Sequence, residues 1–268
     1  MTPAGHFGKI TRAPNTLRQR PYRHHAVRYS ATVDNTTPEA RIHNWHIASR
    51  EYERQESHRG RRFAHPDIDP RTTALVVIDM VPFHVADNPY CRGIVPNINS
   101  LAASLRAAGG TVAWVIPGTT APTPAMIDFF GPRLAETYSK TGGSGPAHTR
   151  IWPDLHTEPR DLFAEKSAFS AFFPGRSPLP HLLEQRHIDT VLITGTVTNV
   201  CCESSARDGS TLGFRVIMIA DANAARRDAE HNATLHTIYR SFGDVRPTAD
   251  VLTMISAANP PHPQQHSR

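Results

Sequence analysis

The chain has 268 residues, of which 39% are hydrophobic and 20% are charged. This length and composition allow one large domain or a domain with appendages, and they exclude a wholly disordered chain. The formal net charge is +5, but residues 1–62 hold 12 Lys and Arg against 5 Asp and Glu, whereas residues 63–268 hold 17 against 19. The basic character therefore belongs to the N-terminal segment and not to the rest of the chain.

The first 36 residues contain several prolines and no sustained apolar periodicity, which predicts a disordered basic extension. Its charges are scattered and its aromatic residues are few, so we expect a solvated segment and no nucleic-acid partner; an arm that binds nucleic acid is the alternative. The segment lacks the apolar stretch of a secretory signal, and the longest apolar runs, such as residues 74–78, have five residues. We therefore expect a cytoplasmic protein without a membrane partner.

Residues 37–65 are predicted to form an N-terminal helix and a connector. Residues 37–39 combine a threonine, a proline and a glutamate, an order typical of a helix start. Apolar side chains then follow at helical spacing through Trp45 to Tyr52, and the pattern ends near Gly60. We expect this helix to pack on the body of the protein or on a second subunit.

Residues 66–258 alternate apolar runs typical of buried strands with helical patterns. We predict strands at residues 73–78, 111–116, 190–194, 214–220 and 251–255, and helices near residues 96–108, 125–137, 178–185, 200–212 and 228–242. Repeated βα units imply a three-layer α/β/α sandwich with a mostly parallel, Rossmann-like sheet. Residues 259–268 are expected to form a flexible tail. No GxGxxG pattern follows a strand, and we expect no cofactor.

Three residues fall at or near the places where an open α/β sheet binds ligands, outside the carboxyl ends of its strands. Asp79 ends the first strand, where it could cap a turn or act as a general base. Cys201 follows the strand at residues 190–194 and begins a helix, where the N-terminus favours a thiolate; a small buried thiol is the alternative. Lys166 is one of only three lysines in a chain that otherwise uses arginine, and it is flanked by apolar residues.

These residues lie in segments that resemble the isochorismatase-like cysteine hydrolases. Residues 194–209 (TGTVTNVCCESSARDG) contain the TG-x-x-T-x-x-C pattern of the family's nucleophile loop. Residues 74–80 (ALVVIDM) resemble the strand that carries the catalytic aspartate, and residues 165–173 (EKSAFSAFF) resemble the segment with the catalytic lysine. The resemblance implies that Cys201 attacks an amide carbonyl, that Asp79 takes the thiol proton, and that Lys166 holds Asp79 ionised.

The family's nucleophile loop also carries a cis peptide bond, which the resemblance places between Thr196 and Val197. The N–H groups of Val197 and Cys201 would then form an oxyanion hole. Members of the family usually form oligomers, so we expect a homodimer or a homotetramer.

Departures from the family pattern bear on the substrate. Phe83 and His84 follow the aspartate where the family often has a Gln-Asn-Asp-Phe run, and we expect them to shape the binding pocket. Trp114, Phe169 and Phe172 are further candidates for substrate binding, although such aromatic residues more often belong to a core. The metal-binding histidine of nicotinamidases has no counterpart after the second strand, so we expect no metal.

The presence of Cys201 favours hydrolysis of an amide over cleavage of a vinyl ether. We expect the substrate to be a small non-peptide amide. The preference for arginine, alanine and proline suggests a high-GC genome, and on that ground a lactam of the streptothricin type is a candidate. The alternatives are a carbamoyl, ureido or nicotinamide-like amide, or a binding protein on an inactive hydrolase scaffold.

Overall fold

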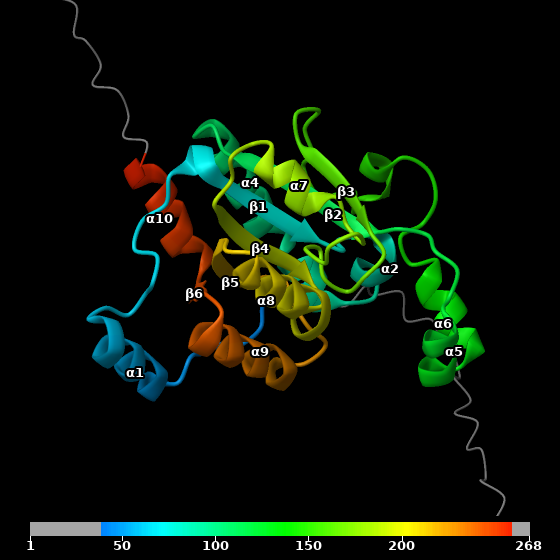
Figure 1. Cartoon of the computed structure of the whole chain (residues 1–268), viewed down its shortest axis with the longest axis horizontal. Helices are drawn as coiled ribbons and strands as arrows, with labels where there is room; N and C mark the ends of the chain where they lie inside the picture. The colour runs from blue at the N-terminus through cyan, green and yellow to red at the C-terminus, as the bar shows by residue number, and fades with distance from the viewer. Residues whose placement is uncertain (1–38, 259–268) are drawn as a thin grey trace, which may run out of the picture. The chain divides into compact units, whose positions relative to one another are not determined.

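The structure is a computed structural model that describes residues 39–258 (Figure 1). The expected extension at residues 1–36, the expected start of the first helix at residues 37–38 and the expected tail at residues 259–268 lie outside the described residues. Within the described part, all strands belong to one sheet in the order β3-β2-β1-β4-β5-β6, and every neighbouring pair is parallel. The strands are β1 (Thr73–Ile78), β2 (Thr111–Pro117), β3 (Leu162–Lys166), β4 (Thr190–Thr196), β5 (Arg215–Ala224) and β6 (Asp244–Arg246).

The apolar runs found in the sequence form the centre of this sheet. Strands β1 and β4 are buried along their whole length, and β2 is buried up to its last residue. A strand covered by helices on both faces needs apolar side chains at every position, which explains why these segments read as continuous runs. The chain order reverses between β1 and β4, and open α/β sheets bind ligands at such a switch point, outside the carboxyl ends of the strands.

Helices cover both faces of the sheet. One core cluster joins β1 through Leu75 and Val77 to α4 and α10, and a second joins β1 through Val76 and Ile78 to α7, α8 and α9. The α-helices are α1 (Ser49–Arg59), α2 (Pro82–Val85), α3 (Pro89–Gly93), α4 (Val95–Ala107), α5 (Pro124–Phe130), α6 (Pro132–Ser139), α7 (Leu179–Glu184), α8 (Glu203–Thr211), α9 (Asp228–Ser241) and α10 (Thr248–Ala258). The predicted three-layer α/β/α sandwich with a parallel sheet is therefore confirmed. No helix among residues 39–258 is long and apolar enough to span a bilayer.

Several predicted elements differ in the structure. The predicted strand at residues 251–255 is wrong, because Val251, Met254 and Ile255 bury one stripe of the helix α10, and β6 is the last strand. The helix expected near residues 125–137 is two helices, α5 and α6, which meet at Gly131 with a φ of 78°. This pair stands apart from the sheet in Figure 1, and α5 buries none of its residues. Strand β3 was not predicted.

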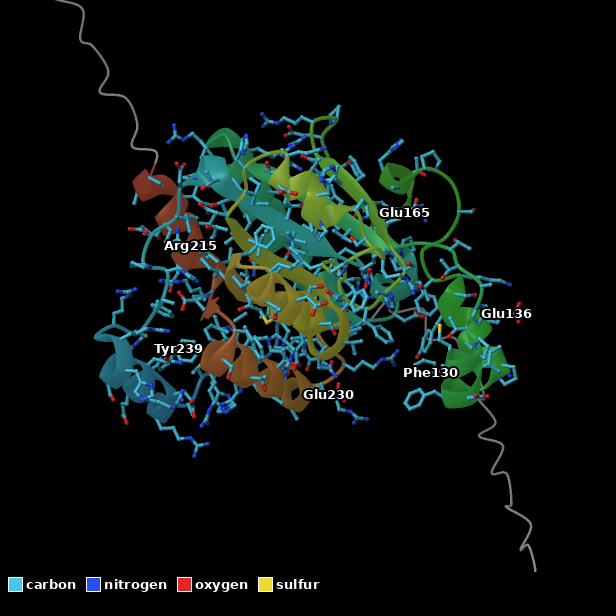
Figure 2. The ribbon with its side chains drawn as sticks, viewed as in Figure 1. Phe130, Glu136, Glu165, Arg215, Glu230 and Tyr239 are labelled. Atoms are coloured by element: carbon cyan, nitrogen blue, oxygen red, sulfur yellow. The ribbon has the colours of Figure 1, made fainter. Side chains whose placement is uncertain are left out.

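The N-terminal helix begins later than its apolar spacing predicts. Residues 39–48 have no regular secondary structure, and α1 begins at Ser49. Tertiary partners satisfy the backbone of this segment: the Arg41 N–H donates to the Pro89 carbonyl at 3.1 Å, and the His46 N–H donates to Asn232 Oδ1 at 2.8 Å. We call residues 39–48 the strap. Helix α1, which follows the strap, packs on α9; Tyr239 of α9 is labelled in Figure 2.

Candidate active site

Asp79 directly follows β1 and has a left-handed backbone, with a φ of 55°. Aspartate tolerates this region better than most residues. The Asp79 N–H continues the sheet by donating to the Val115 carbonyl at 2.8 Å, and its carbonyl accepts from the Val81 N–H at 2.8 Å. The side chain is buried, and its Oδ1 atom has no hydrogen-bond partner among the described residues. The backbone thus places a buried carboxylate with one unbonded oxygen at the end of β1, beside β4.

Lys166 is the last residue of β3, two strands away from β1 in the sheet. Its backbone pairs with Pro117 at the end of β2, and its Nζ lies 2.8 Å from Asp79 Oδ2. The same ammonium donates to the Ala168 carbonyl at 3.2 Å and to Cys201 Sγ at 3.5 Å. An ammonium has three protons, so these three acceptors use all of its donors and fix the group in place. Glu165, labelled in Figure 2, precedes it and is exposed.

Cys201 belongs to a five-residue π-helix, Thr198–Cys202, between β4 and α8. Short π-helical turns occur often at functional sites because they re-aim side chains. We call residues 196–202 the nucleophile loop. Gly195 precedes it with a φ of 111°, and a Cβ atom there would lie 2.1 Å from the Ile78 carbonyl oxygen. Glycine therefore allows the loop to start in close contact with β1, next to Asp79.

The charges of this cluster oppose one another. Burial and the Asp79 carboxylate raise the pKa of the Cys201 thiol to about 12, and the Lys166 ammonium opposes that rise. Burial by itself disfavours the ammonium, but Asp79 and Cys201 raise the pKa of Lys166 above its usual range. A raised pKa favours the protonated thiol, whereas a helix N-terminus by itself would favour the thiolate. The adjacent carboxylate is the group placed to remove that proton.

The peptide bond between Thr196 and Val197 is cis, as the family resemblance implies. Val197 comes directly before the π-helix, and its carbonyl accepts from the Val200 N–H at 3.0 Å and the Cys202 N–H at 3.3 Å. Thr196 is fixed from the side by two contacts: its hydroxyl donates to the Ala224 carbonyl at 3.1 Å and lies 3.3 Å from Cys91 Sγ. The loop that carries Cys201 is thus anchored immediately before the nucleophile.

The structure separates the aromatic candidates into two groups. His84 lies close enough to the cluster to interact with its charges. Burial lowers the pKa of His84, the Asp79 charge raises it, and the Lys166 charge lowers it. Its ring contacts Phe83 edge-on at 5.0 Å, and both Phe83 and Phe169 are largely exposed. Trp114 and Phe172 are instead fully buried core residues, which corrects their prediction as substrate-binding residues.

The burial of the two core aromatics has a clear cause. The Trp114 indole N–H donates to Asp161 Oδ2 at 2.8 Å, on the face of the sheet covered by α4. Phe172 packs edge-on against Phe214, with 5.5 Å between ring centroids. Cys91, in α3, and Cys202 are likewise buried.

Arg226 is a residue near the site that the sequence did not single out. It is exposed and follows β5 at the same edge of the sheet as Asp79. Burial is the main cause of the lowered pKa of His84; the Asp79 charge opposes it, and the charges of Lys166 and then Arg226 add to it. One arginine among many carries no signal in the sequence, and the predicted strand at residues 214–220 ends too early to place Arg226 at the edge of the sheet, since β5 extends to Ala224. Among residues 39–258 no group of three or more His, Cys, Asp or Glu side chains is arranged to hold a metal ion.

Comparison with known protein families matches residues 73–250 to the isochorismatase domain. Among curated proteins, the uncharacterized isochorismatase family protein YwoC of Bacillus subtilis (strain 168) is 30% identical over 190 residues, which is 70% of this chain and 97% of YwoC.

Solved structures with the same fold include a cysteine hydrolase from Pseudomonas syringae pv. phaseolicola 1448A. It is 28% identical, with a TM-score of 0.63, and the match covers 73% of this chain and 97% of that one. An isochorismatase family protein from Desulfovibrio vulgaris subsp. vulgaris str. Hildenborough is 25% identical, with a TM-score of 0.58 and coverage of 69% and 99%.

Proposed function

The chain belongs to the isochorismatase family, and from this premise we propose that it is a cysteine hydrolase that cleaves a C–N amide bond of a small non-peptide molecule. The observation that carries the proposal is the buried ammonium of Lys166, which lies 2.8 Å from Asp79 Oδ2 and 3.5 Å from Cys201 Sγ. This arrangement joins a nucleophile, a base and the cation that keeps the base charged. Asp79, Lys166 and Cys201 are therefore the proposed catalytic residues.

In the first half of the reaction, Cys201 Sγ forms a bond to the carbonyl carbon of the amide while Asp79 takes the thiol proton. The free oxygen of Asp79, Oδ1, is the proposed proton acceptor, since Oδ2 is already bonded to Lys166. The N–H groups of Val197 and Cys201 would donate to the oxyanion. The C–N bond then breaks, the amine leaves with the proton from Asp79, and the acyl group stays on sulfur as a thioester.

In the second half, Asp79 removes a proton from water as the water oxygen attacks the thioester carbonyl. The C–S bond breaks, the carboxylic acid leaves, and the proton returns to Cys201 Sγ. Lys166 keeps a positive charge beside the carboxylate throughout, which favours the ionised base at the start of each half. One carboxylate thus serves as acid and base twice in each turnover.

Two classes of substrate are proposed. A streptothricin-type lactam is a cyclic amide, and it fits the same steps with the amine retained in the product. A carbamoyl or ureido acid is the second class, because the exposed Arg226 at the same sheet edge offers a partner for a substrate carboxylate. Arg226→Gln distinguishes them: it raises KM for an amide that carries a carboxylate while kcat stays similar, and it leaves turnover of a lactam without a carboxylate unchanged.

The proposal is tested by acid-quenching the enzyme during turnover of lactam, N-carbamoyl, ureido and nicotinamide substrates, followed by intact mass spectrometry. A thioester adduct that maps to Cys201 is expected, and Cys201→Ala abolishes both adduct and turnover. Cys202→Ala is the matched control, since the neighbouring thiol is buried 3.9 Å from the Thr194 carbonyl. Turnover that survives in Cys201→Ala contradicts the proposal. Binding of these amides without turnover or adduct favours a binding protein on an inactive scaffold.

The expectation of a homodimer or homotetramer stays a prediction. Size-exclusion chromatography with light scattering measures the mass directly, against 29.6 kDa for one chain.

A further inference from the structure

The strap lies outside the family domain, because the family match begins at residue 73. It nevertheless runs in close contact with that domain. A Cβ atom on Gly93 would lie 2.1 Å from the Arg41 carbonyl oxygen, so the strap backbone is pressed against α3. The Arg41 guanidinium lies over the Tyr90 ring, 4.4 Å from its centroid. The contacts that lead from the strap toward the site are made two residues later, by His43.

His43 inserts its ring between two aromatic side chains from different helices. It stacks on Tyr90 of α3 with ring centroids 3.7 Å apart and on His231 of α9 with centroids 4.2 Å apart. Both of its nitrogens are bonded. Nε2 accepts from the Ala225 N–H at 3.0 Å, so the proton belongs to Nδ1, which lies 2.6 Å from Asp228 Oδ1.

This stack ends at the nucleophile loop. His231 Nδ1 lies 2.9 Å from the Thr198 hydroxyl, and Thr198 is the first residue of the π-helix that carries Cys201. Both His231 and Thr198 are fully buried. The loop is therefore held on both sides of Val197, by the Thr196 contacts described above and by the histidine stack at Thr198.

We propose that His43 is a positioning residue, through which the strap fixes the nucleophile loop in the geometry that the thiol attack requires. The inference rests on the proposed function, since it concerns the same nucleophile. His43 touches neither Cys201 nor its proposed base; it acts through His231 and Thr198. The enzyme would thus draw part of its active-site order from a segment that the family domain does not contain.

The chemistry of His43 favours this role over simple anchoring of the strap. An aliphatic side chain would anchor the strap without cost, and Ile47 does so, with its side chain buried in the core cluster under α9. A buried imidazole costs free energy unless both nitrogens are bonded, and here both bonds are made. The two bonds fix the tautomer and the plane of the ring, which is what holds His231 in line with Thr198.

The test compares His43→Phe with the wild-type full chain. Phenylalanine keeps the ring stack and removes both hydrogen bonds. We expect kcat to fall roughly 10- to 100-fold, because small displacements of reacting groups have effects of that order, while KM changes less than about twofold, since no contact to substrate is lost. Hydrogen exchange of the peptide that covers residues 196–202 should become faster. Asp228→Asn should give the same changes to a smaller degree, and it guards against a folding failure, because the Asp228 side chain is 44% exposed.

Two variants in the same strap serve as controls. His46→Ala should leave kcat and exchange unchanged, because the hydrogen bond at His46 involves its backbone N–H only. Ile47→Ala should lower Tm without changing kcat well below Tm. The loss of kcat is compared with the loss of Tm in His43→Phe and in Ile47→Ala. If the two variants lose kcat in the same proportion to their loss of Tm, His43 acts through stability and the inference is overturned. Unchanged exchange at residues 196–202 in His43→Phe overturns it as well, even if no amide proves to be a substrate, so that its failure is distinguishable from that of the proposed function.

Discussion

Replacing Lys166 by methionine should strongly destabilise the protein and remove its activity. Methionine keeps most of the apolar stem of lysine but removes the charge beside Asp79. The Lys166 and Asp79 side chains are 4% and 2% exposed, so water cannot take the place of the ammonium. The Asp79 carboxylate is left buried without a counter-charge, which is costly where water is excluded. The carboxylate also loses the group that links it to Cys201, so the proposed reaction should stop.

The distance between the charges sets the scale of the effect. Unit charges separated by 2.8 Å attract by about 6 kcal/mol at an effective dielectric constant near 20. Desolvation of both groups offsets part of this attraction, and removal of one partner from a buried pair typically costs about 3–5 kcal/mol. Since the whole free energy of unfolding of a domain is about 5–15 kcal/mol, Lys166→Met should lose a large part of it.

Urea unfolding followed by circular dichroism measures this loss, with the double variant Asp79→Asn/Lys166→Met as the control. The double variant buries no uncompensated charge, so its free energy of unfolding should recover to within about 1–2 kcal/mol of the wild type. Neither variant should hydrolyse an amide. A loss below about 1 kcal/mol in Lys166→Met, or a double variant as unstable as the single one, would refute the reasoning about the pair.

Three further predictions concern the same region. Gly195→Ala should lower the free energy of unfolding by roughly 2–6 kcal/mol, through backbone strain and overlap with β1. Gly213→Ala is the control, because Gly213 also has a positive φ but no atom lies within 4 Å of the added Cβ, so only the strain is expected. Equal urea midpoints for the two variants would contradict this. Burial, and next His43, lowers the pKa of His231 from 6.5 to about 3, so the stability it contributes is complete above pH 6.5 and is lost as the pH falls toward 3, by about 1.4 kcal/mol per pH unit; a urea midpoint that is constant from pH 7 to 4.5 would be the opposite result. Iodoacetamide should label Cys201 alone in the native chain, slowly at pH 7 and faster up to pH 10, because its thiol pKa is raised and the other two thiols are buried; labelling of those two at the same rate would be inconsistent with the structure.

The strands that were predicted from the sequence are those that are buried along most of their length. β1 and β4 are buried on both faces, so every residue carries the signal. Strand β3 is an edge strand that contains exposed Glu165 and buried Lys166. Because buried and exposed residues are mixed in it, its sequence does not differ clearly from that of a loop. The five-residue run at residues 251–255 is ambiguous by length alone. Its assignment is decided by contacts with α4, which a single sequence does not reveal.

Candidate site residues were predictable to the extent that position along the strands determined them. Asp79 and Cys201 follow strand ends, and a parallel sheet brings such ends to one edge. Trp114 and Phe172 were misassigned because an aromatic side chain fits a core and a pocket equally well, and only the partners, Asp161 and Phe214, decide between them. His43 gave no signal, since its contacts come from residues about 50 and 190 positions away in the chain.

The connector that follows α1 has a consequence for how the sheet can associate. β6 is an edge strand, and an open edge can pair with a strand of another molecule. Here the backbone N–H groups of Ala64 and His65 donate to Asp244, the Arg246 guanidinium donates to the His65 carbonyl at 2.8 Å, and that guanidinium lies over Phe63. The polypeptide itself thus occupies the flank of its last strand. Strand addition past β6 would have to displace these contacts, which disfavours this edge as a place where copies pair.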